Sequence, residues 1–171
     1  MPRKERQIQT IAYLQDKNKI LLAMKKRGFG EGRWNGYGGK VLPGEDIANA
    51  ARREILEESK INAWGLSKSG VIDFSFNEKV NKILEVHIYR ITHFKGHPEE
   101  TEEMKPQWFN VDELPYSEMW PTDKIWLPLF LKKYSFHGKV HFQSPTANEA
   151  ISYDIRAKTP KGIEIKLIQR E

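Results

Sequence analysis

The sequence predicts an α/β chain, and three observations support this expectation. Apolar residues alternate, or run nearly continuously, in several short segments bounded by turn residues, a pattern typical of strands. A glutamate-rich segment ending at residue 58, drawn as a helix, carries its carboxylates on one face and small apolar side chains on the next. Further along, Trp126, Leu127, Phe130 and Leu131 recur at helical spacing, which predicts a second helix and a place for these side chains in the core.

The elements follow one another in a clear order. Residues 24–41 contain six glycines between Gly28 and Gly39, too many for a regular element, and 96–105 form an acidic loop. The second helix is expected from Asp123 to about Lys133, with Thr122 or Asp123 as its N-cap. Alternation around a turn at 158–162 predicts a hairpin within residues 150–169. The other predicted strands are 7–14, 19–24, 70–76, 83–94 and 107–111.

Length and composition limit the classes of protein to consider. A chain of 171 residues, 39% hydrophobic, suits one globular domain spanning 1–171. The absence of cysteine excludes disulfides, thiolate nucleophiles and cysteine-zinc sites, and it fits a reducing compartment. The start, MPRKERQIQT, has no apolar core of a secretory signal, and no apolar run reaches membrane-spanning length. The net charge of +5 suits either nucleic acid or a small polyphosphate.

The glutamate-rich helix has the pattern of a metal site. With Glu54 at 0°, Glu57 falls at about −60° and Glu58 at about +40° on the helical wheel. Like charges so close repel each other, and a divalent cation between them removes the repulsion. Carboxylate oxygens suit Mg²⁺ or Mn²⁺. The adjacent face, which we expect to dock on a sheet, carries Ala48, Ala51 and Ile55.

Most glutamate runs are solvated helix faces, but the residues around this one have a specific spacing. Gly39, five residues, Glu45, seven residues, Arg53-Glu54 and then Glu57-Glu58 resemble the Nudix box over 23 positions, 39–61. The one departure is Lys60, where the family usually has a glycine that ends the helix. Lys60 replaces no ligand, so the departure leaves the expected chemistry intact.

Three further stretches narrow the resemblance to one branch of the family. Residues 24–41, 119–123 and 134–142 are similar to the oxidised-purine nucleoside triphosphatases, and the likeness covers about Thr10 to Phe142. It implies a Nudix-type α/β/α sandwich, with a mixed sheet between the glutamate-rich helix and the helix from Asp123 to Lys133. The likeness extends loosely to the first strand of the C-terminal hairpin, and we interpret the second strand as an added edge and assign it no function.

The resemblance also implies an activity. The expected enzyme is a Mg²⁺-dependent diphosphatase, or pyrophosphohydrolase, acting on oxidised purine nucleoside triphosphates such as 8-oxo-dGTP or 2-hydroxy-dATP. Attack on an internal phosphorus would release a nucleoside monophosphate and pyrophosphate, which sanitises the nucleotide pool and supports DNA repair. We expect a cytoplasmic monomer that takes Mg²⁺, or Mn²⁺ in its place, and binds neither membranes nor nucleic acid polymers.

The same resemblance assigns residues to roles. Glu58 would activate water, Arg53 would hold Glu57, and Thr122 stands where the branch has the first of two adjacent aspartates, which leaves the preferred base open. The metal ligands implied are the Gly38 carbonyl, Glu54, Glu57, Glu58 and Glu103. The contacts expected are Lys25 and Lys40 for the phosphates, Phe29, Phe74, Leu84 and Trp120 for a flat slot, and Thr10, Asn35 and Asp123 for the base edge. Further residues expected to contact the substrate are Tyr37, Gly38, Gly39, Pro121 and Thr122, the last as a moderator of base selection.

The sequence also bears on two alternative functions. A Nudix hydrolase for another nucleoside diphosphate derivative, such as a dinucleoside polyphosphate, is disfavoured by the matches at Asn35 and residues 120–123. A binding module for RNA or single-stranded nucleic acid would use the basic charge and exposed aromatic residues. Such a module has no need for the acidic residues of the box, which are all present.

Overall fold

The computed structural model describes residues 3–171, which fall into two compact units. Unit 1 contains the described part of Met1–Gln9 together with Ser69–Ile88 and Pro121–Glu171, and unit 2 contains Thr10–Lys68 and Tyr89–Trp120. None of the helices within residues 3–171 has the length and apolar content needed to span a bilayer. The strands are β1 (Glu5–Asp16), β2 (Lys19–Lys25), β3 (Trp34–Asn35), β4 (Asn62–Phe76), β5 (Lys82–Lys95), β6 (Met104–Asn110), β7 (Ser135–Phe142), β8 (Ala150–Lys158) and β9 (Glu164–Gln169); the helices are α1 (Ile47–Ser59) and α2 (Asp123–Leu131), with 3-10 turns at Asn77–Lys79 and Tyr116–Glu118.

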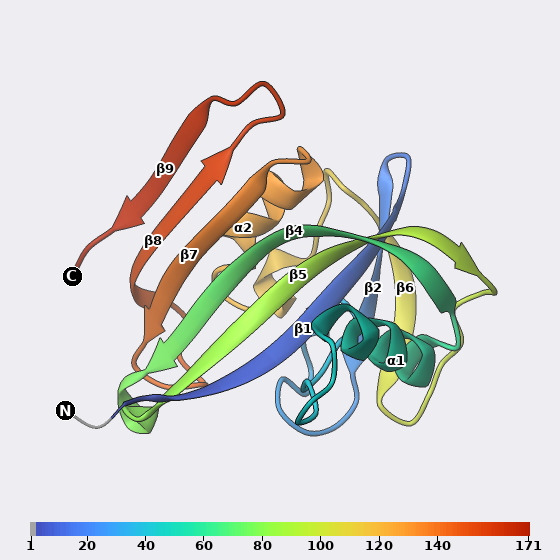
Figure 1. The fold of residues 1–171 in the computed structure, drawn as a ribbon, viewed down its shortest axis with the longest axis horizontal. Helices are drawn as coiled ribbons and strands as arrows, with labels where there is room; N and C mark the ends of the chain where they lie inside the picture. Colours follow the sequence, from blue (N-terminus) through green and yellow to red (C-terminus); the bar gives the residue numbers. More distant parts are fainter. Residues whose placement is uncertain (1–2) are drawn as a thin grey trace. The chain divides into compact units, whose positions relative to one another are not determined.

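The strands form a mixed sheet. Hydrogen-bonded neighbours follow the order β3-β2-β1-β5-β4-β7-β8-β9, and β6 pairs with β2 (Figure 1). The pairing of β4 with β7 is parallel, and the long connection between these strands, which contains β5, β6 and α2, allows the crossover that a parallel pair needs. The pairs β1–β2, β2–β6, β7–β8 and β8–β9 are antiparallel.

In unit 2, helix α1 packs on the strands through the apolar face that the sequence predicts. Ala51 and Ile55 are fully buried, and they share one hydrophobic cluster with Ala12, Leu21 and other strand residues. Asp46 caps the start of the helix by accepting the Asn49 N–H at 3.0 Å. Lys60 ends it in the left-handed conformation, φ 65°, with its N–H donating to the Leu56 carbonyl. A lysine thus takes the backbone conformation that glycine adopts most easily.

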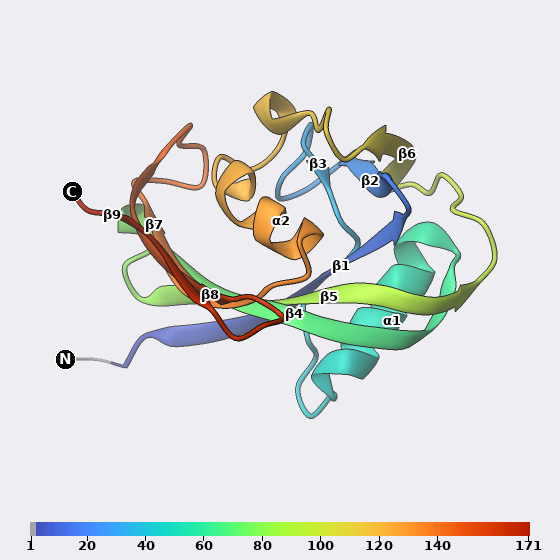
Figure 2. The ribbon, with the colours of Figure 1, turned by 90° about the horizontal axis from the view of Figure 1, so that it is seen from above.

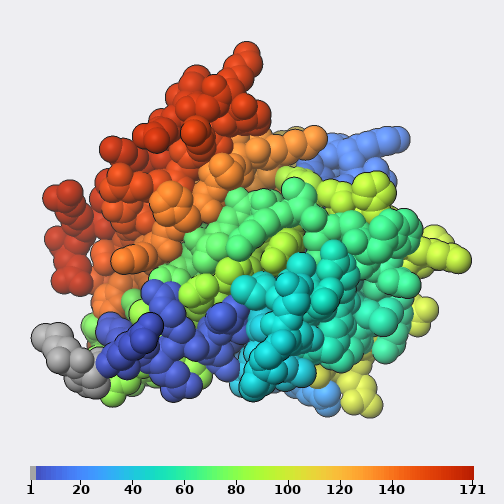
Figure 3. Space-filling model, in the orientation of Figure 1, coloured from blue at the N-terminus to red at the C-terminus, as the bar shows by residue number. Residues whose placement is uncertain are grey.

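In unit 1, helix α2 covers one face of the sheet around β7 (Figure 2). Trp126, Leu127 and Phe130 are buried, as expected, whereas Leu131 is only half-buried. The Trp126 ring lies 5.9 Å from that of Phe136 on β7. Strands β8 and β9 form the predicted C-terminal hairpin, which lies at the surface of this unit, coloured red in Figure 3.

The structure corrects some of the predicted boundaries. Strand β4 begins at Asn62 rather than Gly70, and β6 begins at Met104, inside the expected acidic loop. The two-residue β3 lies within the glycine-rich segment, where Asn35 pairs with Ala23 of β2. Thr122 occupies the N-cap position of α2, but its hydroxyl makes no capping hydrogen bond. Pairing with neighbouring strands extends β4 and β6 beyond the residues that the local sequence pattern predicted.

Candidate active site

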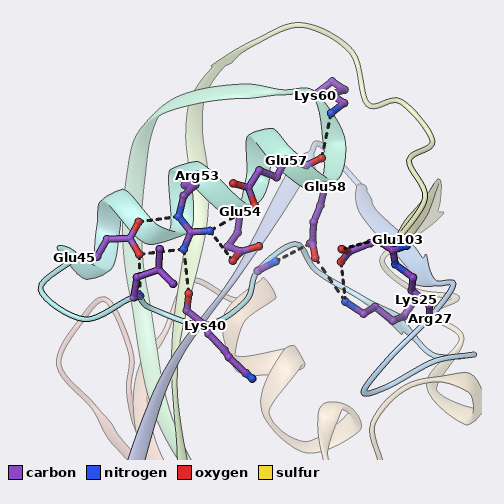
Figure 4. A network of polar contacts seen from close by, with 12 residues as sticks. Lys25, Arg27, Lys40, Glu45, Arg53, Glu54, Glu57, Glu58, Lys60 and Glu103 are labelled. Atoms are coloured by element: carbon purple, nitrogen blue, oxygen red, sulfur yellow. Dashed lines mark hydrogen bonds and ion pairs between the residues drawn. The ribbon is translucent and has the colours of Figure 1, made fainter.

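Arg53 on α1 is the centre of a network that ties the preceding loop to the helix (Figure 4). Its Nε donates to Glu45 at 2.8 Å, Nη1 donates to Glu54 at 2.9 Å, and Nη2 donates to the Lys40 carbonyl at 3.0 Å. The predicted partner, Glu57, is the most distant, at 3.5 Å. The hydrogen bonds from Arg53, with one from the Leu42 N–H, lower the pKa of Glu45 to about 2. Arg53 therefore holds the loop and Glu54 more than it holds Glu57.

Glu58 lies at the end of the same helix and is only 4% exposed. Its Oε2 accepts the Gly38 N–H at 3.1 Å, and its Oε1 lies 3.7 Å from the Lys25 ammonium. Burial raises the pKa of Glu58 to about 7, and the charges of Glu54 and Glu103 act in the same direction, against the opposing effects of Gly38 and Lys25. A carboxyl with such a pKa can accept or release a proton near neutral pH.

Glu103 comes from the segment before β6 and approaches the same place. Its carboxylate lies 3.4 Å from the Lys25 ammonium and 3.1 Å from Arg27 Nη2. The hydrogen bond from Arg27 is the main cause that holds the pKa of Glu103 below its usual value. Lys25 therefore lies between two carboxylates, Glu58 and Glu103, that the sequence places 45 residues apart.

Thr101 connects the segments that carry these two carboxylates. Its hydroxyl donates to the Glu58 carbonyl at 3.2 Å and accepts the backbone N–H groups of Met104 at 3.2 Å and Glu103 at 3.4 Å. Nothing in the sequence analysis identified Thr101. Its position two residues before Glu103, in an acidic loop that must turn toward the helix, is the signal that could have done so.

Glu54 lies against the backbone of Gly39. A Cβ atom at residue 39 would come within 2.5 Å of the Glu54 carboxyl group, so only glycine allows this approach. Burial is the largest cause that raises the pKa of Glu54, the Arg53 hydrogen bond opposes it, and the charges of Glu57 and Glu103 raise it further. The carboxylates of α1 and of the acidic loop thus repel one another in the absence of a shared cation.

The donor set fits a hard divalent cation. Every candidate ligand is an oxygen. Burial together with mutual repulsion raises the pKa of Glu54 and Glu58, so a bound cation would relieve the repulsion between the carboxylates. Within residues 3–171 no three such side chains already converge as a closed metal cage. Lys25, Arg27 and Arg53 pair with the carboxylates instead.

The residues predicted to contact the base lie in both units. In unit 2, Thr10 is buried, and its hydroxyl has no hydrogen-bond partner within residues 3–171. The Asn35 Oδ1 accepts the Gly36 N–H at 3.0 Å and the Tyr13 hydroxyl at 3.1 Å, which fixes the orientation of the amide and leaves its NH₂ group as the available donor. The rings of Phe29 and Trp120 lie 5.1 Å apart.

In unit 1, Thr122 and Asp123 are buried at 1% and 3% exposure, and the described residues offer no hydrogen-bond partner to the Thr122 hydroxyl. Phe74 on β4 stacks with Phe142 at 6.5 Å. Leu84 and Pro121 are half-buried. These residues belong to different elements, and the prediction that they contact one base together is not tested by their positions.

The predicted substrate contacts within residues 24–41 differ in exposure. The Tyr37 side chain is fully buried in the cluster beneath α1, which leaves only its backbone for substrate. The Lys40 side chain is exposed, and its carbonyl is held by Arg53. Lys25 is engaged with Glu58 and Glu103. The glycine-rich segment therefore places the backbone of residues 38–40 beside the carboxylates, and the Lys40 side chain extends away from them (Figure 4).

The site thus combines a buried glutamate at the end of a capped helix, a glycine N–H that holds its carboxylate, and two further carboxylates whose charges act on it. Residues 5–130 match the NUDIX domain model, and the chain belongs to this family.

Two curated relatives resemble most of the chain. The oxidized purine nucleoside triphosphate hydrolase of Mus musculus is 45% identical over 147 residues, covering 86% of this chain and 92% of that protein. The protein of the same name from Danio rerio is 48% identical over 134 residues, covering 78% and 85%. Among solved structures, a MutT protein from Bacillus halodurans superposes with a TM-score of 0.75 at 25% identity, covering 87% of this chain and 97% of that one. These matches confirm the predicted family and the α/β/α sandwich with a mixed sheet.

Proposed function

We propose that this protein hydrolyses oxidised purine nucleoside triphosphates to nucleoside monophosphates and pyrophosphate. The observation that supports the reaction is the buried Glu58, whose carboxylate meets Gly38, Lys25 and, through Lys25, Glu103. The support for the substrate is that both curated relatives, at 45% and 48% identity, are oxidized purine nucleoside triphosphate hydrolases. The dinucleoside polyphosphate and nucleic-acid alternatives have no specific observation in their favour.

In this proposal Glu58 accepts the proton of the attacking water. In the metal-free chain burial raises the pKa of this carboxyl to about 7, which shows that its surroundings favour binding of a proton. The Gly38 N–H fixes the orientation of the carboxylate, and Lys25 compensates charge beside it. Arg53 keeps the loop that carries Lys40 against the helix, so that the exposed Lys40 ammonium can meet a phosphate group.

A divalent cation, proposed here as Mg²⁺ with Mn²⁺ as a substitute, would be held by the Gly38 carbonyl, Glu54, Glu57, Glu58 and Glu103. When bound, it neutralises phosphate charge and lowers the pKa of coordinated water. The chain's own contribution is to gather oxygen donors at one end of α1. The Glu57 side chain is 59% exposed and Arg53 is its only close partner among the described residues, so it can reorient at little cost.

Base recognition is proposed for the half-exposed indole of Trp120, with Phe29 beside it, and for Asn35 and Thr10. The Asn35 amide offers N–H donors to an acceptor on the base, and the Thr10 hydroxyl is buried without a partner within residues 3–171. Asp123 and Thr122 are proposed to select the base, and only one carboxylate is present where the branch of the family has two.

We further propose that the protein is a monomer and a single domain, that it is located in the cytoplasm, and that it binds no nucleic acid polymer. Light scattering of the purified protein checks the monomer. Binding of a long oligonucleotide that weakens steeply with salt would instead favour the nucleic-acid hypothesis.

A kinetic panel tests the proposed function. Oxidised and normal nucleoside triphosphates, with Mg²⁺ or Mn²⁺, are compared for wild type, Glu58→Gln and Glu78→Gln, a matched change at an exposed glutamate outside the site. We expect preference for oxidised purines, a loss in kcat of roughly 10²-fold or more for Glu58→Gln, and no loss for Glu78→Gln. A Glu58→Gln enzyme with near wild-type kcat would refute the assignment of the site.

A further inference from the structure

One loop of unit 2, residues 28–33, contacts the indole of Trp120 at three points. The Phe29 ring centroid lies 5.1 Å from that of Trp120, tilted by 32°. Gly30 has φ +86°, and a Cβ there would lie 3.4 Å from Trp120 Cζ2, so the backbone itself abuts the ring. The Arg33 guanidinium carbon lies over the indole, 4.6 Å from its centroid. The orientation of this ring is therefore tied to the loop.

Arg33 fixes both the ring and the backbone that carries it. Its Nη1 donates to the Met119 carbonyl at 2.8 Å, one residue before Trp120, while its guanidinium plane contacts the indole. The distance of 4.6 Å is within the range of a cation–π interaction. Within residues 3–171 no carboxylate forms an ion pair with Arg33, in contrast to Arg27 of the same segment, which pairs with Glu102 and Glu103.

The backbone of Arg33 is itself anchored. The Lys25 N–H at the end of β2 donates to the Arg33 carbonyl at 3.0 Å, and the Arg33 N–H donates to the Gly30 carbonyl at 3.1 Å. The next residue, Trp34, pairs with Met24 of β2. The side chain thus extends toward Trp120 from a fixed point of the sheet.

We propose that Arg33 is a positioning residue that holds the Trp120 indole as the stacking surface for the base, and so sets the preference of the site for purines over pyrimidines. The proposal rests on the proposed function. The guanidinium covers part of one face of the ring, so a base can stack only where the ring is left open. A purine presents a larger flat surface than a pyrimidine, so a correctly oriented ring benefits the purine more.

The kinetic test compares Arg33→Gln and Arg33→Lys with Glu31→Gln, a control at an exposed side chain of the same loop. We expect Arg33→Gln to lower kcat/KM for an oxidised purine nucleoside triphosphate by roughly 10-fold, mainly through KM. Arg33→Lys, which keeps the charge but loses the planar contact, should recover only part of the loss. Hydrolysis of a pyrimidine nucleotide and the Mg²⁺ concentration for half-maximal rate should not change. Unchanged purine preference in both Arg33 variants overturns the specificity role.

A fluorine NMR measurement tests the positioning without substrate. In protein labelled with 5-fluorotryptophan, Trp120→Phe identifies the Trp120 resonance, and Arg33→Gln should shift or broaden it while the exposed Trp64 resonance stays fixed. A Trp120 resonance that is the same in Arg33→Gln and wild type refutes the positioning. If the wild type does not hydrolyse oxidised purine nucleotides, the proposed function and the specificity role fail together, and the fluorine result alone decides whether Arg33 positions Trp120. Should Arg33→Gln unfold, Arg33→Lys carries both tests.

Discussion

The pKa of Glu58 makes the stability of the metal-free protein depend on pH in a predictable direction. The carboxyl has a pKa of about 7 in the folded chain and 4.5 as its ordinary value. It binds its proton more tightly when folded, so its contribution to stability is fully present below pH 4.5 and is lost as the pH rises through 7. Between pH 5 and pH 8 the free energy of unfolding should fall by roughly 2–3 kcal/mol from this group.

The variant Glu58→Gln isolates this effect. Glutamine keeps the shape of the side chain and can accept the Gly38 N–H, but it does not ionise, so the fall in stability from this group should disappear. The comparison Glu45→Gln should act in the opposite sense, because a pKa of about 2 means that Glu45 stabilises the fold at neutral pH and loses this contribution in acid.

The assay is urea denaturation of the wild type and Glu58→Gln from pH 5 to pH 8, and of the wild type and Glu45→Gln from pH 6 down to pH 3, with a chelator present and ionic strength held constant. The free energy of unfolding of Glu58→Gln relative to wild type should rise with pH by roughly 2–3 kcal/mol. Added Mg²⁺ should stabilise the wild type more than the variant. Parallel pH profiles for wild type and Glu58→Gln would refute the burial argument.

Three further predictions concern single side chains. Lys60→Gly should raise the free energy of unfolding by about 1 kcal/mol, because the residue has φ 65°, whereas Lys60→Ala should not; equal stabilities in thermal denaturation would contradict this. Thr101→Val should weaken Mn²⁺ binding several-fold in calorimetry, because it frees the acidic loop from α1, and Thr101→Ser should bind as wild type does; no difference between the two would count against the loop's role. Asp123→Ala should lower kcat/KM for oxidised purine nucleotides by roughly 10- to 150-fold, equivalent to about 1.5–3 kcal/mol, and should lower kcat/KM for pyrimidine nucleotides little. Thr122→Asp should raise kcat/KM for 8-oxo-dGTP relative to an oxidised adenine nucleotide. An equal loss on all nucleotides in Asp123→Ala would mean that Asp123 supports the fold rather than base selection.

The local pattern predicted those parts of the fold that carry a strong period. The apolar face of α1 and the alternation in β8 and β9 were both legible in the sequence. The early start of β4 at Asn62 was not, because residues 62–69 owe their extended form to strand pairing rather than to alternation. The conformation of Lys60 could be expected only from the family's glycine, since nothing local favours a lysine with positive φ.

The carboxylates of the site were identified from spacing, but their partners were not. Helical geometry places Glu54, Glu57 and Glu58 on one arc, yet only the folded chain places Lys25 between Glu58 and Glu103. Contacts between segments far apart in the sequence leave no periodic signal. Arg33 was missed for the same reason, because its partners Met119 and Trp120 are more than 80 residues away.

The identity of the first products tests most directly whether water attacks an internal phosphorus and whether this reaction needs Glu58. The purified protein is incubated with 8-oxo-dGTP and Mg²⁺, with no pyrophosphatase present, and the products are separated by ion chromatography. We expect equal amounts of 8-oxo-dGMP and pyrophosphate from the wild type, and almost none from Glu58→Gln. Orthophosphate as the first product, or equal turnover by the variant, would contradict it.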